Sequence, residues 1–153
     1  MPSPDVLALN PQLKQQGSLN SATANRRTRT TEADEQIALI EWRDLRLARE
    51  PRLRLLFHPP NGGLRDKATA GQMKALGQSP GVPDLLLPVG SRGYVGLAIE
   101  LKTTSGVVSP EQAEWLDALR DNGWMATVQR GWLSAAAMLC WYLDRDDLRK
   151  ELE

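Results

Sequence analysis

Three charged side chains stand at the ends of two short apolar runs near the middle of the chain. Asp84 precedes the first run, residues 85–87, whereas Glu100 and Lys102 end the second run, which begins at residue 95. Two apolar runs joined by a glycine-containing turn predict a β-hairpin. Because side chains two positions apart in a strand point to the same side, Glu100 and Lys102 share a face. Antiparallel pairing then brings Asp84 close to Glu100.

These three groups have the chemistry of a metal-dependent hydrolytic site. Two carboxylates are hard oxygen ligands, which suit Mg²⁺ or Mn²⁺ better than Zn²⁺. A lysine ammonium beside the ion can act as a general acid or as an electrostatic clamp. The alternative is a surface ion pair between Lys102 and Asp84 or Glu100, which contributes little to stability. We favour the metal site, because the hairpin carries three charges where a core strand should carry none.

Four short stretches, in this order, resemble the VRR-NUC (virus-type replication-repair nuclease) subfamily of the PD-(D/E)xK nucleases. Asp84 after a proline, followed by Glu100 and Lys102, looks like the signature of the larger group, which is short and common. The ordered set of four stretches is more specific, and the resemblance covers residues 32–143. The stretches are residues 58–63 (HPPNGG), 81–85 (GVPDL), 99–102 (IELK) and 109–112 (SPEQ).

The resemblance implies an α/β fold of the restriction-endonuclease-like type, in which helices flank a mixed sheet. It also implies a metal-dependent DNA endonuclease with one or two Mg²⁺ or Mn²⁺ ions bound by Asp84, Glu100 and the main-chain carbonyl of Leu101. Lys102 would orient or help deprotonate the attacking water and stabilise the developing charge. Gln112 would point at the active site and hold a phosphate oxygen.

In the family, the first helix supplies a further acidic residue toward the metal. Here residues 31–49 predict that helix, with acidic residues in its first turn and Pro51 after its end. Glu32, Glu35 and Gln36 compete for the position. Glu32 and Gln36 lie four residues apart and share one face of the helix, so we favour this pair, with Glu35 as the alternative.

The rest of the chain supplies the elements that must position these groups. Apolar periodicity, capping residues and turn residues give the order α-β-α-ββ-α-β-α. The expected elements are a helix over 31–49, a strand over 52–57, a helix over 64–76, the hairpin, a helix capped by Ser109, a strand over 124–129 beside the Glu100 strand, and a helix over 131–143.

The loop and short helix before the hairpin predict a surface that faces DNA. Tight glycine turns expose backbone N–H groups that can approach a phosphate, and basic residues follow. His58, at the start of this loop, can position a water or a phosphate, or it is a hydrogen-bonded structural histidine. The residues expected to contact DNA are Asn61, Gly62, Gly63, Arg65, Lys67 and Lys74.

Length and composition fit one folded domain over residues 31–153, preceded by a polar tail over residues 1–30 that we expect to be disordered. Basic and acidic residues balance at 19 each, so a nucleic-acid surface must be local. No apolar run is long enough to cross a bilayer, and the single cysteine, Cys140, excludes an internal disulfide. We expect a cytoplasmic protein of a bacterial or phage-infected cell, without a membrane partner.

The function expected from this resemblance is structure-selective cleavage of DNA, in particular of four-way (Holliday) junctions during DNA repair. Symmetric incision of two strands requires two active sites, which favours a homodimer. The alternatives are a monomeric flap or nicking nuclease, a catalytically silent DNA-binding module, and a nuclease that acts on RNA. The complete set of Asp84, Glu100 and Lys102 argues against the silent module.

Overall fold

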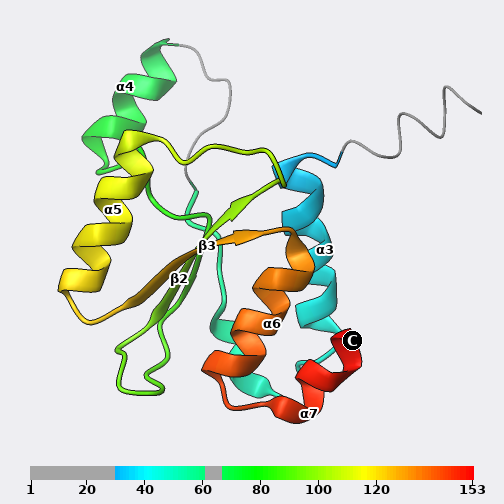
Figure 1. Ribbon diagram of the computed structural model, residues 1–153. Coiled ribbons are helices and arrows are strands. Elements are labelled where there is room, and N and C mark those ends of the chain that lie inside the picture. The colour runs from blue at the N-terminus through cyan, green and yellow to red at the C-terminus, as the bar shows by residue number, and fades with distance from the viewer. Residues whose placement is uncertain (1–29, 61–66) are drawn as a thin grey trace, which may run out of the picture. The chain divides into compact units, whose positions relative to one another are not determined.

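The computed structural model describes residues 30–60 and 67–153 (Figure 1). The tail predicted over residues 1–30 therefore lies almost entirely outside the described residues. So do four of the residues expected to contact DNA, and of a fifth, Lys67, only the backbone is described. The four are Asn61, Gly62, Gly63 and Arg65.

The predicted hairpin is confirmed, and it forms two strands of the sheet. Strand β1 (Leu85–Leu87) pairs antiparallel with β2 (Leu97–Lys102), with Leu85 opposite Ile99. Extending this register by one residue places Asp84 opposite Glu100. Strand β3 (Met125–Arg130) pairs parallel with β2 on its other side, as expected for the strand after the capped helix. In the described part of the chain the sheet is mixed, with the order β1-β2-β3.

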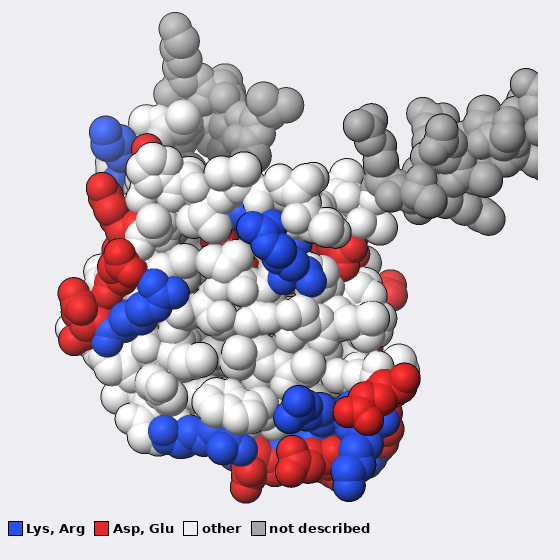
Figure 2. All heavy atoms as spheres, viewed as in Figure 1, with Lys and Arg blue, Asp and Glu red and all other residues white. Residues whose placement is uncertain are grey.

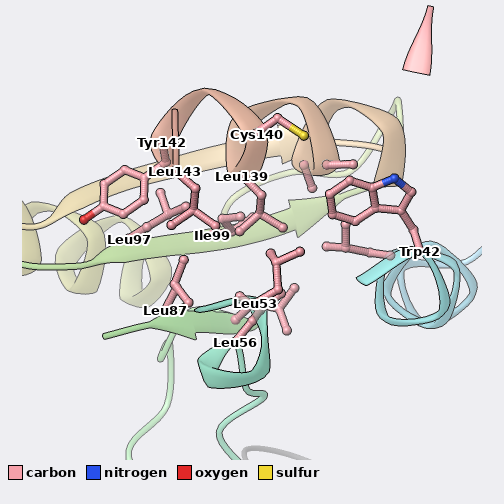
Figure 3. Packing of buried hydrophobic residues seen from close by; sticks show 14 of the residues in the cluster. Trp42, Leu53, Leu56, Leu87, Leu97, Ile99, Leu139, Cys140, Tyr142 and Leu143 are labelled. Carbon is pink, nitrogen blue, oxygen red and sulfur yellow. The ribbon is translucent and has the colours of Figure 1, made fainter. Parts of the chain in front are cut away.

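Strand β2 is central and buried over its whole length. Because its side chains alternate, Leu97, Ile99 and Leu101 enter the larger core, whereas Ala98 belongs to a smaller cluster with Leu116. Figure 3 shows the larger core, where side chains of β2 meet those of helices on one side of the sheet. Residues of even number in β2 therefore face the opposite side, toward the helix that follows the hairpin. Glu100 and Lys102 are two of them.

Helices cover both faces of this sheet (Figure 1). The first predicted helix ends earlier than expected, at Asp44, and is followed by turns up to Arg49. The helix α6 (Trp132–Tyr142) packs against α3 (Glu32–Asp44), β2 and β3, whereas α5 (Pro110–Asp121) packs against β2 and β3 from the other side. No helix in residues 30–60 and 67–153 is long and apolar enough to span a membrane. The helices are α3 (Glu32–Asp44), α4 (Lys67–Ala75), α5 (Pro110–Asp121), α6 (Trp132–Tyr142) and α7 (Asp146–Arg149), with a final 3₁₀ turn η2 (Lys150–Leu152).

The strand predicted over residues 52–57 is wrong. The segment forms a 3₁₀ helix, η1 (Pro51–Leu55), and only Phe57 pairs with the sheet, through an isolated bridge to Leu86. Proline favours a helix start, and the Glu50 side chain accepts a hydrogen bond from the backbone of Arg52. The buried leucines are then three residues apart, as the 3₁₀ period requires, at Leu53 and Leu56.

Candidate active site

Asp84 is fixed to the strand that carries the other two charged groups. Its Oδ2 accepts a hydrogen bond of 2.8 Å from the backbone N–H of Leu101. Its own carbonyl oxygen lies 2.6 Å from Nδ1 of His58. Burial raises the pKa of the Asp84 carboxyl, although the Leu101 N–H and the charge of Lys102 act in the opposite direction. Asp84 is therefore held between Glu100 and Lys102 along β2.

Glu100 is the most deeply buried charged group of the site, with 1% of its surface exposed. Its Oε1 lies 2.8 Å from Nζ of Lys102 and 2.5 Å from Nε2 of Gln112, and it accepts from both. The pKa of Glu100 is raised to about 7, mainly because the group is buried; the hydrogen bond from Lys102 lowers this pKa, and the nearby charge of Asp84 contributes to raising it. Its Oε2 is buried and has no hydrogen-bond partner among the described residues.

Lys102 connects the buried carboxylate to the first helix. The residue is only 4% exposed, and its Nζ also lies 3.5 Å from both carboxylate oxygens of Glu32. Burial alone would lower the pKa of Lys102, but the hydrogen bond that it donates to Glu100 and the surrounding carboxylates outweigh burial, and the pKa is raised. Lys102 is therefore an ammonium at neutral pH, and not a free amine that accepts a proton.

Gln112 reaches Glu100 because a capping box fixes it at the start of α5. Ser109 Oγ accepts a hydrogen bond from the Gln112 backbone N–H at 3.2 Å, and Gln112 Oε1 accepts one from the Ser109 backbone N–H at 2.9 Å. The amide nitrogen is then aimed at Glu100. The Gln112 side chain points into the site, and its amide nitrogen contacts Glu100.

Replacing Gln112 by alanine should reduce the rate of the DNA cleavage expected from the sequence about tenfold, because Glu100 Oε1 loses a hydrogen bond that orients it. The matched control is Ser109→Ala, which breaks the same capping box and should cost about 1 kcal/mol of stability. That control keeps the amide of Gln112, so its cleavage rate should fall much less. Initial cleavage rates and thermal unfolding of both variants measure the difference. Equal losses of activity would show that Gln112 acts only as a helix cap.

Of the three candidates on the first helix, Glu32 is the one that contacts Lys102. Glu35 instead contacts another helix, because its Oε2 accepts a hydrogen bond of 2.8 Å from the backbone N–H of Trp132, at the first turn of α6. Gln36 lies one turn after Glu32 and lines a pocket together with His58. The structure thus brings Glu32 to the charged cluster, which consists of Asp84, Glu100 and Lys102. Glu35 instead caps α6.

Arg130 is a residue of this region that sequence reasoning missed. Its Nη1 donates to the carbonyl oxygens of Thr103, Thr104 and Gly106, which form the loop after Lys102. A Cβ atom on Gly106 would lie 2.9 Å from Glu32 Oε1 and 3.1 Å from Lys102 Cδ, so this loop packs closely on the site. The feature of the sequence that could have indicated Arg130 is its place directly after the strand predicted beside the Glu100 strand. In the register of β2 and β3, Arg130 pairs with Lys102.

The loop before Asp84 also approaches the helix that carries Gln112. Gly81 has φ +85°, and a Cβ atom there would lie 2.5 Å from backbone atoms of Glu111. Only glycine allows both this conformation and this distance. The contact holds the Asp84 segment against the first turn of α5, which places the two halves of the cluster side by side.

The donor groups of the cluster fit a hard divalent cation. The buried Oε2 of Glu100 lacks a partner among the described residues, and a buried carboxylate oxygen of this kind is a strong ligand for Mg²⁺ or Mn²⁺. The described residues contain no group of three or more His, Cys, Asp or Glu side chains arranged around one point. A cation here would accordingly need main-chain or water oxygens besides the carboxylates.

The expected DNA surface is described only in part. Lys67 begins α4, and Lys74 lies in the last turn of this helix with its side chain exposed to solvent. The contact of these residues with DNA stays a prediction.

A fold with this hairpin, flanking helices and buried Glu100–Lys102 pair is that of a PD-(D/E)xK-type nuclease domain. The family model of the VRR-NUC domain matches residues 30–132, and the chain belongs to the VRR-NUC family, a family of nucleases. A solved structure named "VRR_NUC domain protein" is similar to this chain, with 24% sequence identity and a TM-score of 0.65. The similarity covers 76% of this chain and 91% of that chain. At 24% identity, this similarity supports the assignment of the fold alone. No curated protein matches the chain.

Proposed function

We propose that this protein is a metal-dependent, structure-selective DNA endonuclease that cuts four-way junctions as a homodimer. The observation that carries the proposal is the buried Glu100, whose Oε1 binds Lys102 while its Oε2 has no partner within the described part of the chain. A pair of charges buried at a strand end costs desolvation energy. In a VRR-NUC domain, a catalytic role of this pair explains why the fold keeps it despite that cost.

Asp84, Glu100 and the main-chain carbonyl of Leu101 would hold Mg²⁺ or Mn²⁺. When bound, the ion would activate a water molecule and neutralise charge on the phosphate. The reaction adds the oxygen of water to phosphorus and breaks one P–O bond of the backbone, and the leaving oxygen takes up a proton.

The protein's own groups prepare this reaction. The Leu101 N–H keeps the Asp84 carboxylate in place, and Gln112 orients Glu100. Lys102, as an ammonium, donates hydrogen bonds to the oxygens on which negative charge develops, which is worth more in a site that excludes water. Its raised pKa favours this electrostatic role over deprotonation of the water. Glu32 lies on the other side of the Lys102 ammonium and helps to keep it charged.

A homodimer is proposed because resolution of a junction requires two cuts. In Figure 2 charged side chains gather at the margins of this face and in one basic group in its upper middle, near the end of β3, whereas the area below that group, over α6, carries few of them. A groove of about 400 Å³ in this area is lined by Met125, Ala137, Met138 and Trp141 and by the polar Gln129, Ser134 and Arg149. Leu133 of α6 is 49% exposed. An area that combines apolar side chains with a few polar ones suits contact with a second copy.

The test compares one strand sequence presented as a four-way junction, a flap and a plain duplex, and as an RNA of the junction shape. Each strand of a substrate is labelled at its 5′ end in turn, and the substrate is incubated with Mn²⁺ or Mg²⁺. The proposal predicts paired, symmetric nicks in the DNA junction, together with a dimeric mass in sedimentation. Preferred cleavage of the flap by a monomer would overturn the junction assignment. Preferred cleavage of the RNA would overturn the choice of DNA.

A further inference from the structure

A second pocket lies beside the charged cluster, on the outer side of α3. It has a volume of about 380 Å³ and opens to solvent. Residues from two turns of α3 form one wall, and His58 forms another. The lining residues are Ala33, Gln36, Ile37, Ile40, Glu41 and His58.

Two connections place this pocket close to the candidate active site. The first is His58: because a carbonyl oxygen can only accept, the short contact with Asp84 requires the proton on Nδ1. This bond fixes the imidazole ring against the Asp84 segment. The second connection is α3 itself, since Gln36 lies one turn after Glu32, which contacts Lys102.

The lining combines flat or apolar surfaces with a small number of polar groups. Ile37 is 58% exposed and leaves apolar surface in contact with water. Ile40 is partly buried behind it. The imidazole of His58 offers an aromatic ring, and Gln36 and Glu41 place an amide and a carboxylate at the rim. Such a lining suits a planar aromatic ligand with hydrogen-bonding groups along its edge.

We infer that this pocket binds one unstacked nucleobase of the DNA, next to the phosphodiester bond that is cut. The inference rests on the proposed function and gives a reason why the protein would select branched DNA over plain duplex. Bases in a plain duplex stay stacked and paired, whereas junctions and flaps offer bases that leave the stack at little cost. Every base has a flat face, so stacking against His58 and Ile37 would tolerate any sequence. The amide of Gln36 can donate as well as accept, which suits different base edges.

The test measures binding without cleavage, in buffer that contains a chelator and no divalent ion. The probe is a four-way DNA junction with 2-aminopurine, a fluorescent base, in the base pair nearest the branch. Ile37→Asp places a charge in the pocket, and the matched control Leu45→Asp does so outside it, at a side chain that is 80% exposed. Because both positions are exposed, both variants should fold like the wild type, which circular dichroism verifies.

We expect the wild type and Leu45→Asp to bind equally and to change the 2-aminopurine fluorescence equally. For Ile37→Asp, binding should weaken about tenfold, because the charged side chain keeps the base from its place against His58, and the fluorescence change should disappear. Tight binding of all three proteins with identical fluorescence would overturn the pocket while leaving the proposed function in place. Absence of DNA binding by the wild type, both in chelator and with Ca²⁺ as a divalent ion that replaces Mg²⁺, would overturn both.

Discussion

Replacing Glu100 by glutamine is expected to lower the rate of metal-dependent DNA cleavage by at least about a hundredfold. The variant keeps the shape of the side chain, and its amide oxygen can still accept from Lys102. What it loses is the negative charge of a carboxylate that the fold buries at a cost, with 1% of the residue exposed. Since a neutral amide is a weaker ligand for a hard divalent cation, the loss should fall on the chemical step.

Single-turnover cleavage at saturating protein measures this loss separately from DNA binding. The matched control is Glu114→Gln, which removes a carboxylate from an exposed position of α5 and should cleave like the wild type. DNA affinity, measured without divalent ion, should be similar for both variants. Unchanged cleavage by Glu100→Gln would show that the buried carboxylate has a structural role only.

Replacing Glu50 by glutamine is expected to have the largest effect on stability, a loss of about 2 to 3 kcal/mol at neutral pH. The Glu50 side chain is buried and accepts from Arg52 at 2.7 and 2.8 Å and from Arg145 at 3.0 Å. It thereby joins the start of η1 to the segment after α6. The hydrogen bond from Arg52 is the main reason why the pKa of Glu50 is lowered to about 2, although burial acts against it.

The stability conferred by Glu50 should depend on pH in a defined direction. Its pKa is lower in the folded protein than in the unfolded chain, so the contribution is full above about pH 5, where the unfolded carboxyl is also ionised. It is lost progressively as the pH falls toward 2. Urea unfolding at pH 7 and at pH 3 should therefore show a smaller difference between wild type and Glu50→Gln at the lower pH.

The exposed pair of Asp117 and Arg120 provides the control for this experiment. The Asp117 side chain is 72% exposed, and pairs of this kind contribute little. Asp117→Asn should leave the unfolding midpoint nearly unchanged at both pH values. A difference between wild type and Glu50→Gln that grows on acidification would contradict the account of Glu50.

The hairpin and its partners were predictable from the sequence because they obey local rules. Short apolar runs, a glycine-containing turn and the Ser109 cap each determine structure within a few residues. The placement of Glu100 and Lys102 on one face follows from the strand period alone. The family resemblance, confirmed over residues 30–132, rested on short motifs that keep their order along the chain.

What the sequence did not reveal depends on contacts between distant residues. Alternating arginines and leucines after Pro51 suit a strand as well as a 3₁₀ helix, and the outcome follows from Glu50 and from the burial of Leu53 with Leu56. The choice of Glu32 over Glu35 follows from the position of Trp132, which is 97 residues from Glu35. Helix periodicity alone carries no information on such a partner.

The most direct test of the central claim is cleavage of a labelled four-way DNA junction by the wild type and by Lys102→Ala, with and without Mn²⁺ or Mg²⁺. We expect paired symmetric nicks that require the metal and that disappear in the variant, because Lys102 supplies the charge beside Glu100. Tight, metal-independent binding without cleavage of any DNA by the wild type would contradict the account and identify a silent DNA-binding module.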